Sequence, residues 1–323
     1  MTALTFAGVL QAADAIATEL PPTPSWSYPA LNATVGCDIV VKHENVQPTG
    51  AFKVRGGVSF ISGLSEQERS RGLVTASTGN HAQSVAYAAR LVGAQATVVM
   101  PESAPQEKVL ATQLLGATVV TFGGTMGESC DHAREFAAST GMRFVSPGDE
   151  PAIVHGHATI YLELLQRHPD LEAIYVPVGS GSGAAGACVV RDAIAPGCRI
   201  IGVQSQLAPA AYNSWRSGQV ESAECHTRFS GVATSRGSAL PLSVMHPRLD
   251  DFVLVSDEQI TDAMRLLAGT AHTLAEGAAA ASLAGLLRDE HRPQRCAVVC
   301  TGGNADASEL ADLAASRHLA AAL

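Results

Sequence analysis

The strongest constraint on the fold of this chain is the alternation of short apolar strands with helices from about residue 72 to the end. Strands that are apolar on both faces are typical of a parallel sheet covered by helices on both sides. In the first half of the alternation we expect strands at 72–76, 96–100 and 118–122 and helices at 79–91, 106–115 and 127–138. The sequence therefore predicts an α/β fold.

The alternation continues in a second half, which suggests two lobes. In this half we expect helices at 153–166, 183–194, 276–287 and from 307 onward, with strands at 173–178, 199–203, 252–255 and 297–300. A separate helix is expected near the N-terminus, at 6–17. The pattern fades between residues 206 and 250. Ser256 and Gln259 have capping-box spacing, so a helix should begin there. Turn residues at Arg71-Gly72 and Pro147-Gly148-Asp149 indicate the seams between the lobes.

Composition and charge exclude several classes of protein. The formal net charge of -9 argues against nucleic-acid or acidic-membrane partners, and no apolar run is long enough to span a bilayer. The seven cysteines have no paired spacing, which predicts free thiols in a reducing compartment. No leader pattern is visible at the N-terminus, so we expect the cytoplasm as the compartment.

Four polar or Gly-rich segments follow predicted strands, at the edge of an open α/β sheet where ligands bind. They are 48–56, 76–83, 178–186 and 299–304. In the first segment, Lys53 follows Phe52. An amine that is partly desolvated beside an aromatic ring has a lowered pKa and can attack an aldehyde. For this segment alone, a solvated lysine at a helix start is the commoner alternative.

The segments at 76–83 and 178–186 have the composition of anion sites. The first opens a predicted helix, where free N–H groups and hydroxyls bind carboxylates, although an ordinary N-cap is the alternative. The second contains Gly-x-Gly-x-x-Gly from Gly181 to Gly186. The next strand ends at Val203-Gln204-Ser205, without the acid that a dinucleotide ribose requires. We therefore expect this loop to hold a single phosphate, with a plain strand–helix turn as the alternative.

Together, these segments resemble one family over the chain from about Val40 to Asn304. Thr-Gly-Ala-Phe-Lys-x-Arg-Gly, Ser-Thr-Gly-Asn-His-Ala-Gln, a Gly/Ser loop and Thr-Gly-Gly-Asn occur in this order. The order resembles fold-type II pyridoxal-phosphate (PLP) enzymes, which have a fold like the tryptophan synthase β subunit. It is most similar to threonine/serine dehydratases and serine racemases. The resemblance implies pyridoxal 5'-phosphate as cofactor, a large cofactor-binding domain (1–71 and 150–323), a small mobile domain (72–149) and a homodimer.

The resemblance also implies roles for individual residues. Lys53 would carry the cofactor as a Schiff base and Phe52 would lie against its ring. Asn80 and Thr301 would bond the ring's phenolic oxygen and its pyridine nitrogen, and Glu276 would lie near the cofactor. Because a hydroxyl cannot keep the pyridine nitrogen protonated as a carboxylate would, Thr301 favours elimination over transamination. The phosphate would be bound by Gly179, Ser180, Gly181, Ser182 and Gly183, and the substrate by Ser77, Thr78, Gly79, His81 and His157.

The activity implied is removal of the β-hydroxyl from a 3-hydroxy amino acid, which yields a 2-keto acid and ammonia. Lys53 would remove the Cα proton. Serine, threonine, phenylserine and 3-hydroxyaspartate all stay open as substrates. An amino-acid racemase is the alternative, with Thr78 as second catalytic residue where racemases have serine. A non-catalytic nucleotide-binding protein and an inactive PLP-binding relative are further alternatives.

Departures from the family pattern bear on the same site. Ser180 and Ser182 stand where relatives usually have glycines, and their hydroxyls would add phosphate bonds. His155 and His157 replace the alanine and glutamine of Ala-Gly-Gln-Gly-Thr, either to tune specificity or as two exposed histidines at a helix start. Gln204 begins a stretch without the two acids through which many relatives bind a divalent cation, so no metal site is expected.

Overall fold

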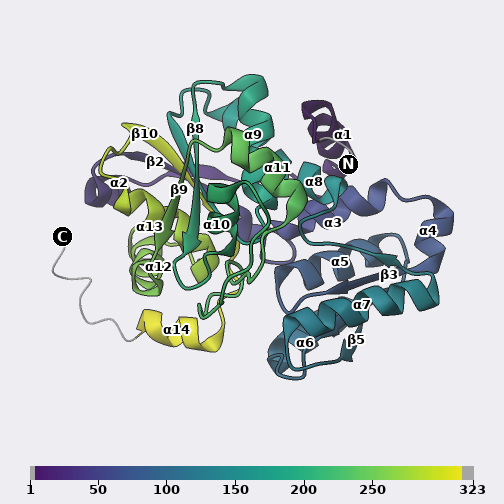
Figure 1. The fold of residues 1–323 in the computed structure, drawn as a ribbon. Coiled ribbons are helices and arrows are strands. Elements are labelled where there is room, and N and C mark those ends of the chain that lie inside the picture. The colour runs from purple at the N-terminus through teal and green to yellow at the C-terminus, as the bar shows by residue number, and fades with distance from the viewer. Residues whose placement is uncertain (1–3, 315–323) are drawn as a thin grey trace.

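A six-stranded sheet forms the centre of the larger lobe in the computed structural model, which describes residues 4–314 (Figure 1). Its strand order is β1-β2-β10-β7-β8-β9, and every neighbouring pair is parallel except β1 with β2. The strands are β1 (Ser25–Ser27), β2 (Asp38–His43), β7 (Ala173–Pro177), β8 (Arg199–Ser205), β9 (Asp251–Val255) and β10 (Arg295–Cys300).

Helices cover both faces of this sheet. One face packs against α8 (Pro151–Arg167), α9 (Ser182–Ile194) and α11 (Ala239–Arg248), and the other against α2 (Pro29–Val35), α12 (Asp257–Ala271) and α13 (Gly277–Arg288). Strand β10 shows why both faces of the sheet need a covering layer of helices. Its Ala297 and Val299 enter the first core, whereas Cys296 and Val298 enter the second, because successive side chains of a strand point to opposite faces.

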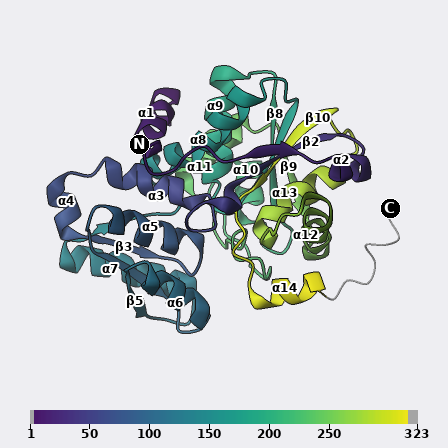
Figure 2. The same cartoon turned by 180° about the vertical axis from the view of Figure 1, so that it is seen from behind.

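The smaller sheet is fully parallel and has the order β5-β4-β3-β6. Its strands are β3 (Leu73–Ala76), β4 (Ala96–Met100), β5 (Thr118–Thr121) and β6 (Arg143–Phe144). The core on one face includes α5 (Asn80–Leu91) and α6 (Gln106–Leu114), and α7 (Met126–Thr140) covers the other. The two sheets stand side by side in both views, which confirms a two-lobe α/β fold (Figure 2).

Helix α3 (Lys53–Ser62) packs against helices of both lobes, namely α5 and α8. A Cβ at Gly156 of α8 would lie 2.4 Å from the carbonyl oxygen of Arg55, so only glycine allows this approach of the two helices. The predicted division at residues 71 and 149 agrees with the sequence range of the smaller sheet. Since α3 precedes residue 71 and contributes to the core around α5, the boundary itself stays a prediction.

Most of the expected elements occur close to their predicted positions. The Ser256 hydroxyl accepts from the Gln259 N–H in the predicted capping box. The segment 206–250, where the pattern fades, is mostly irregular but contains α10 (Ala210–Ser217) as well as α11. The remaining helices are α1 (Phe6–Ile16), α4 (Glu66–Arg71), α14 (Ala307–Ala314) and the 3-10 helix η1 (Glu44–Val46). The predicted continuation of the last helix lies outside the described residues.

Sequence patterns did not predict β1, β2, α2, α3, α4 or β6, and they made β8 and β10 two residues too short. Within residues 4–314, no helix combines the length and apolarity needed to cross a membrane.

Candidate active site

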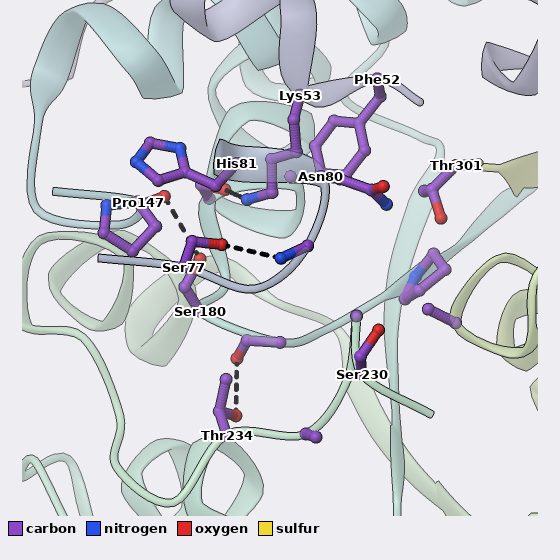
Figure 3. Close-up of a pocket in the computed structure, with 18 of the residues that line it drawn as sticks. Phe52, Lys53, Ser77, Asn80, His81, Pro147, Ser180, Ser230, Thr234 and Thr301 are labelled. Carbon is purple, nitrogen blue, oxygen red and sulfur yellow. Dashed lines mark hydrogen bonds between the residues drawn. The ribbon is translucent and has the colours of Figure 1, made fainter. Parts of the chain in front are cut away.

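The four segments singled out in the sequence meet in one cavity, at the carboxyl ends of strands from both sheets (Figure 3). The segment after β3 supplies one wall, and the loops after β7 and β10 supply others. All predicted site residues line this cavity except His157. The lining also includes residues that were not predicted: Ala76, Met126, Pro147, Pro177, Ser230, Gly231, Ala233, Thr234 and Ala278.

Backbone hydrogen bonds fix the position of Lys53. The Phe52 N–H donates to the Thr301 carbonyl at 2.8 Å, and the Gly303 N–H donates to the Gly50 carbonyl at 2.9 Å. These bonds join the segment before α3 to the loop after β10. Lys53 is the first residue of α3, and its side chain points into the cavity beside the ring of Phe52 (Figure 3).

The surroundings of Lys53 are those of a reactive amine. Desolvation lowers the pKa of Lys53 to about 8. Its Nζ lies 4.9 Å from the centroid of the Phe52 ring and 3.3 Å from Ser182 Oγ. A larger fraction of this amine is neutral near pH 7 than for an ordinary lysine, and the neutral form is the nucleophile. The structure thus shows a half-buried amine in the cavity in place of the alternative, a solvated lysine at a helix start.

A buried ionic network anchors the helix that carries Lys53. Arg55 donates to both carboxylate oxygens of Glu44, at 2.7 and 2.9 Å, and to both of Glu163, at 2.6 and 2.9 Å. Lys42 also donates to Glu163, at 2.5 Å. Arg55 and Glu44 have no exposed surface. This arrangement accounts for the arginine two positions after Lys53, since it ties α3 to α8 and η1.

The Gly/Ser loop before α9 has the geometry of a phosphate cradle. Gly181 is the N-cap of α9 with φ of +89°, and no side chain caps the helix, so its first N–H groups face the cavity. A Cβ at Gly179 would lie 2.4 Å from the Gly231 carbonyl oxygen. The Thr234 hydroxyl donates to the Gly179 carbonyl at 3.2 Å. The loop thus presents backbone donors at a site where a side chain would not fit.

A second set of hydroxyl and N–H groups lies at the start of α5. The Gly79 N–H donates to Ser77 Oγ at 3.2 Å, and both residues line the cavity with Thr78. His81 is buried, with Nε2 3.3 Å from the Val145 carbonyl oxygen. Burial, followed by the nearby charge of Lys53, lowers the pKa of His81 to about 3. The imidazole is therefore neutral and cannot supply positive charge to a carboxylate.

Asn80 is held on both sides of its amide. Its Nδ2 donates to Glu276 Oε1 at 2.7 Å, and its Oδ1 accepts from Asn304 Nδ2 at 2.8 Å. The Nδ2 group has a second hydrogen, which is available to a ligand in the cavity. Burial raises the pKa of Glu276 to about 7, although the bond from Asn80 opposes the shift.

The two unusual histidines of α8 are not exposed. His157 has no exposed surface and does not line the cavity, so the predicted direct contact with substrate is not what this structure shows. Its Nδ1 lies 3.0 Å from Ser182 Oγ. His155 is half-buried, and its Nε2 accepts from the Thr5 N–H, where it supports the start of α1. His157 is buried and His155 is half-buried, which corrects the alternative of two exposed histidines at a helix start.

Gln204 begins the stretch in which no divalent-cation site was expected, and its side chain is hydrogen-bonded within the protein. Its side chain accepts from the Tyr212 N–H and donates to Thr234. Among residues 4–314, no cluster of three His, Cys, Asp or Glu side chains has the arrangement of a metal site.

Sequence reasoning missed the segment Ser230–Thr234 because its Ser, Gly and Thr residues resemble an ordinary surface turn. Its place in the cavity follows from the contact of Gly231 with Gly179, two residues far apart in the chain. The local signal that could have indicated a loop entering the protein is the pair of apolar residues Phe229 and Val232, both of which are buried.

One family model and several named proteins match this chain. The family described as "Pyridoxal-phosphate dependent enzyme" matches residues 16–302. An L-threonine ammonia-lyase of Thermotoga maritima is 39% identical over 85% of this chain and 69% of its own length. An L-threo-3-hydroxyaspartate ammonia-lyase of Saccharomyces cerevisiae is 32% identical over 97% of both chains. Among solved structures, maize serine racemase has a TM-score of 0.91 at 28% identity, covering 95% of this chain and 96% of the maize chain.

Proposed function

The chain belongs to the family of pyridoxal-phosphate-dependent enzymes, and we propose that it is a dehydratase that removes the β-hydroxyl of a 3-hydroxy amino acid. The products are a 2-keto acid and ammonia. The observation that carries the proposal is the amine of Lys53, with a pKa near 8, pointing into a cavity that also holds an anion cradle. The ammonia-lyase relatives support the same reaction class.

The cavity fits the cofactor group by group. The Lys53 amine suits its aldehyde, the N–H groups at 179–183 suit its phosphate, and Phe52 offers a ring face. Asn80 has a free amide hydrogen for the phenolic oxygen, and Thr301 offers a hydroxyl to the pyridine nitrogen. When bound, the cofactor supplies electron withdrawal from the substrate Cα, which makes the Cα proton acidic.

The protein's own groups then have distinct tasks. Ser77, Thr78 and the N–H groups at the start of α5 orient the substrate carboxylate. Lys53 Nζ removes the Cα proton, since its lowered pKa leaves an adequate fraction as free amine near neutral pH. Ser182 Oγ accepts a hydrogen bond from the resulting ammonium. The β-hydroxyl leaves as water with one proton, which balances the proton that Lys53 removed from Cα. Hydrolysis of the released enamine consumes one water and gives the keto acid and ammonia.

The charge of the cavity supports a substrate with a neutral β-substituent. Among the described residues that line it, Lys53 is the one cation, and the cofactor occupies that amine. His81 is neutral, and Glu276 would repel a second carboxylate when ionised. A β-carboxylate buried without a cation loses its hydration without compensation. We therefore propose serine or threonine in preference to 3-hydroxyaspartate.

A keto-acid release assay tests this function directly. Serine, threonine, phenylserine and both 3-hydroxyaspartate diastereomers are offered at equal concentration, and kcat/KM is compared. We expect serine or threonine to exceed 3-hydroxyaspartate at least tenfold. No keto acid from any of the five would overturn the dehydratase assignment, whereas preference for 3-hydroxyaspartate would overturn only the substrate argument.

Racemisation is the second candidate, because the Thr78 hydroxyl lines the cavity and would have to serve as the second proton donor and acceptor. Chiral analysis of the serine recovered from the assay separates the two activities. A D-serine yield that exceeds the yield of pyruvate would favour the racemase.

Assembly and location complete the proposal. We propose a cytoplasmic homodimer whose segment 72–149 moves as a small domain to close on substrate. The free thiols of the seven cysteines agree with a reducing compartment. Sedimentation at micromolar concentration tests the dimer, and cell fractionation tests the location. Hydrogen exchange of segment 72–149 with and without substrate tests closure.

A further inference from the structure

A hydroxyl group bridges the amine of Lys53 to a buried imidazole. Ser182 Oγ lies 3.3 Å from Lys53 Nζ and 3.0 Å from His157 Nδ1. The His157 ring packs behind Phe52, with ring centroids 4.6 Å apart. His157 Nε2 is buried and has no hydrogen-bond partner among the described residues. The imidazole therefore makes its one side-chain hydrogen bond toward the catalytic site.

The charges around the bridge leave Ser182 as the main partner of the amine. His81 from α5 and His157 from α8 both face Lys53, and burial lowers the pKa of each, so both are neutral. Arg55 from α3 adds positive charge near His157, but its hydrogen bonds go to the carboxylates of Glu44 and Glu163. Glu276 lies in the same cavity, where its amide partner is Asn80. Among residues 4–314, Lys53 Nζ donates to no acceptor other than Ser182 Oγ.

The bridge can serve both protonation states of the amine. With its proton on Nε2, His157 accepts the Ser182 hydroxyl hydrogen at Nδ1, and the Ser182 oxygen accepts from the Lys53 ammonium. With its proton on Nδ1, His157 donates to Ser182, whose hydrogen then points at the lone pair of the neutral amine. The hydrogen bond to the charged form is the stronger of the two, so the bridge favours the ammonium.

We infer that His157, acting through the Ser182 hydroxyl, is a positioning residue that holds the Lys53 amine and stabilises its protonated form. The inference rests on the proposed role of Lys53 in catalysis. It also joins two departures from the family pattern, since glycine at position 182 would remove the hydroxyl on which an imidazole at position 157 acts.

The pKa of Lys53 in the cofactor-free protein measures this coupling directly. The chain has only three lysines, Lys42, Lys53 and Lys108, so selective labelling with lysine carrying 13C at Cε gives three signals. The loss of one signal in Lys53→Arg assigns it. Lys42 is held by Glu163 outside the bridge, and an unchanged Lys42 signal reports that a variant is folded.

The variants separate a hydrogen-bonding role from packing. We expect the pKa of Lys53 to fall by about 1 unit in Ser182→Ala and by a similar amount in His157→Phe, which keeps an aromatic ring. The double variant should show no further fall, because each single change breaks the same bridge. His157→Asn, whose amide reaches the position of Nδ1, should restore most of the native pKa. His155→Phe, on the same helix, is the control and should leave it unchanged.

Two results would overturn the inference. One is a Lys53 pKa within about 0.2 unit of the native value in Ser182→Ala. The other is a fall in Ser182→Ala without any fall in His157→Phe, which would leave His157 as packing alone. Borohydride reduction of the native holoenzyme, followed by peptide mapping, is a separate test of Lys53 itself. A label away from residue 53 would overturn the proposed function and leave the titration result standing.

Discussion

Replacement of Arg55 by methionine should destabilise the fold strongly, although Arg55 does not line the cavity. Arg55 and Glu44 have no exposed surface, and Arg55 makes two hydrogen bonds to each of two carboxylates. Methionine fills a similar length but donates nothing. The change would leave Glu44 buried, while the remaining cation of the network, Lys42, donates to Glu163 instead.

The loss of stability in Arg55→Met depends on the carboxylates that remain buried without their arginine. The four charge-assisted bonds do not simply add, because the arginine and both acids lose hydration on burial. Removal of one partner from a buried ion pair costs about 3–5 kcal/mol, since the other charge is left uncompensated. Glu163 keeps Lys42 and is partly exposed, so most of the loss should come from Glu44. We expect a loss of about 4 kcal/mol in the free energy of unfolding near pH 7.5.

The stability deficit of Arg55→Met should also depend on pH in a characteristic direction. Burial raises the pKa of Glu44, but the charge and hydrogen bonds of Arg55 outweigh burial and hold it below the usual 4.5. In the native protein, Glu44 therefore contributes stability above that pH, and the contribution is lost as pH falls through the folded pKa. Without Arg55, burial acts largely alone and raises the pKa of Glu44. The variant then gains stability as it takes up a proton, so its deficit should shrink between pH 7.5 and 5.

Urea unfolding followed by circular dichroism at both pH values measures this deficit. Arg143→Met is the matched control, because Arg143 is 48% exposed in its pair with Glu150 and should cost less than about 1 kcal/mol. Glu44→Gln combined with Arg55→Met should recover part of the loss. If Arg55→Met behaves like Arg143→Met, or if its deficit grows as pH falls, the network does not act as described.

Three further predictions concern the cavity. Lys53→Ala should abolish both the visible absorbance of the bound cofactor and keto-acid release, and full activity would refute the role of this amine. Gly179→Ala should weaken cofactor binding at least tenfold in a fluorescence titration, because its Cβ would lie 2.4 Å from the Gly231 carbonyl oxygen, whereas Ser180→Ala should change it less. Glu276→Gln should become more stable relative to native as pH rises from 5 to 8, by up to about 3 kcal/mol. The raised pKa of about 7 means that native Glu276 is buried neutral at low pH and loses that stability as it ionises; a difference independent of pH would contradict this.

Elements with one dominant local signal could be predicted from the sequence. Strand β4 was placed at its observed bounds because Ala96–Met100 is continuously apolar and Pro101 ends it. Helix α12 followed from a capping box whose two bonds are both present. The carboxyl-edge position of the segments at 76–83, 178–186 and 299–304 also followed from predicted strand ends, since parallel strands bring their carboxyl ends to one edge.

Helix α3 shows why other elements could not be predicted. Its sequence contains Gly56 and Gly57, which disfavour a helix. In the structure, a Cβ at Gly56 would lie 2.5 Å from His157 Nε2, and one at Gly57 would lie 2.5 Å from Ser84 Oγ. The glycines that weaken the local signal are thus the residues that let α3 approach α8 and α5. Strand β2 was missed for a related reason, because Lys42 interrupts its apolar pattern and is buried only through its ion pair.

The contact between His157 and Ser182 could not be predicted by interpreting each motif separately. Taken alone, Ser182 is an extra hydroxyl in a phosphate loop and His157 is an imidazole at a helix start, and each has an ordinary explanation. The structure places them 3.0 Å apart although they are 25 residues apart in the chain, and it puts Lys53 on the far side of the same hydroxyl. An imidazole that is buried with one nitrogen unpartnered carries a desolvation penalty, which a packing residue such as phenylalanine would avoid. The bond to Ser182 satisfies the other ring nitrogen and leaves Nε2 without a partner. We therefore attribute Ser182 and His157 together to one role, which is exerted on the amine of Lys53.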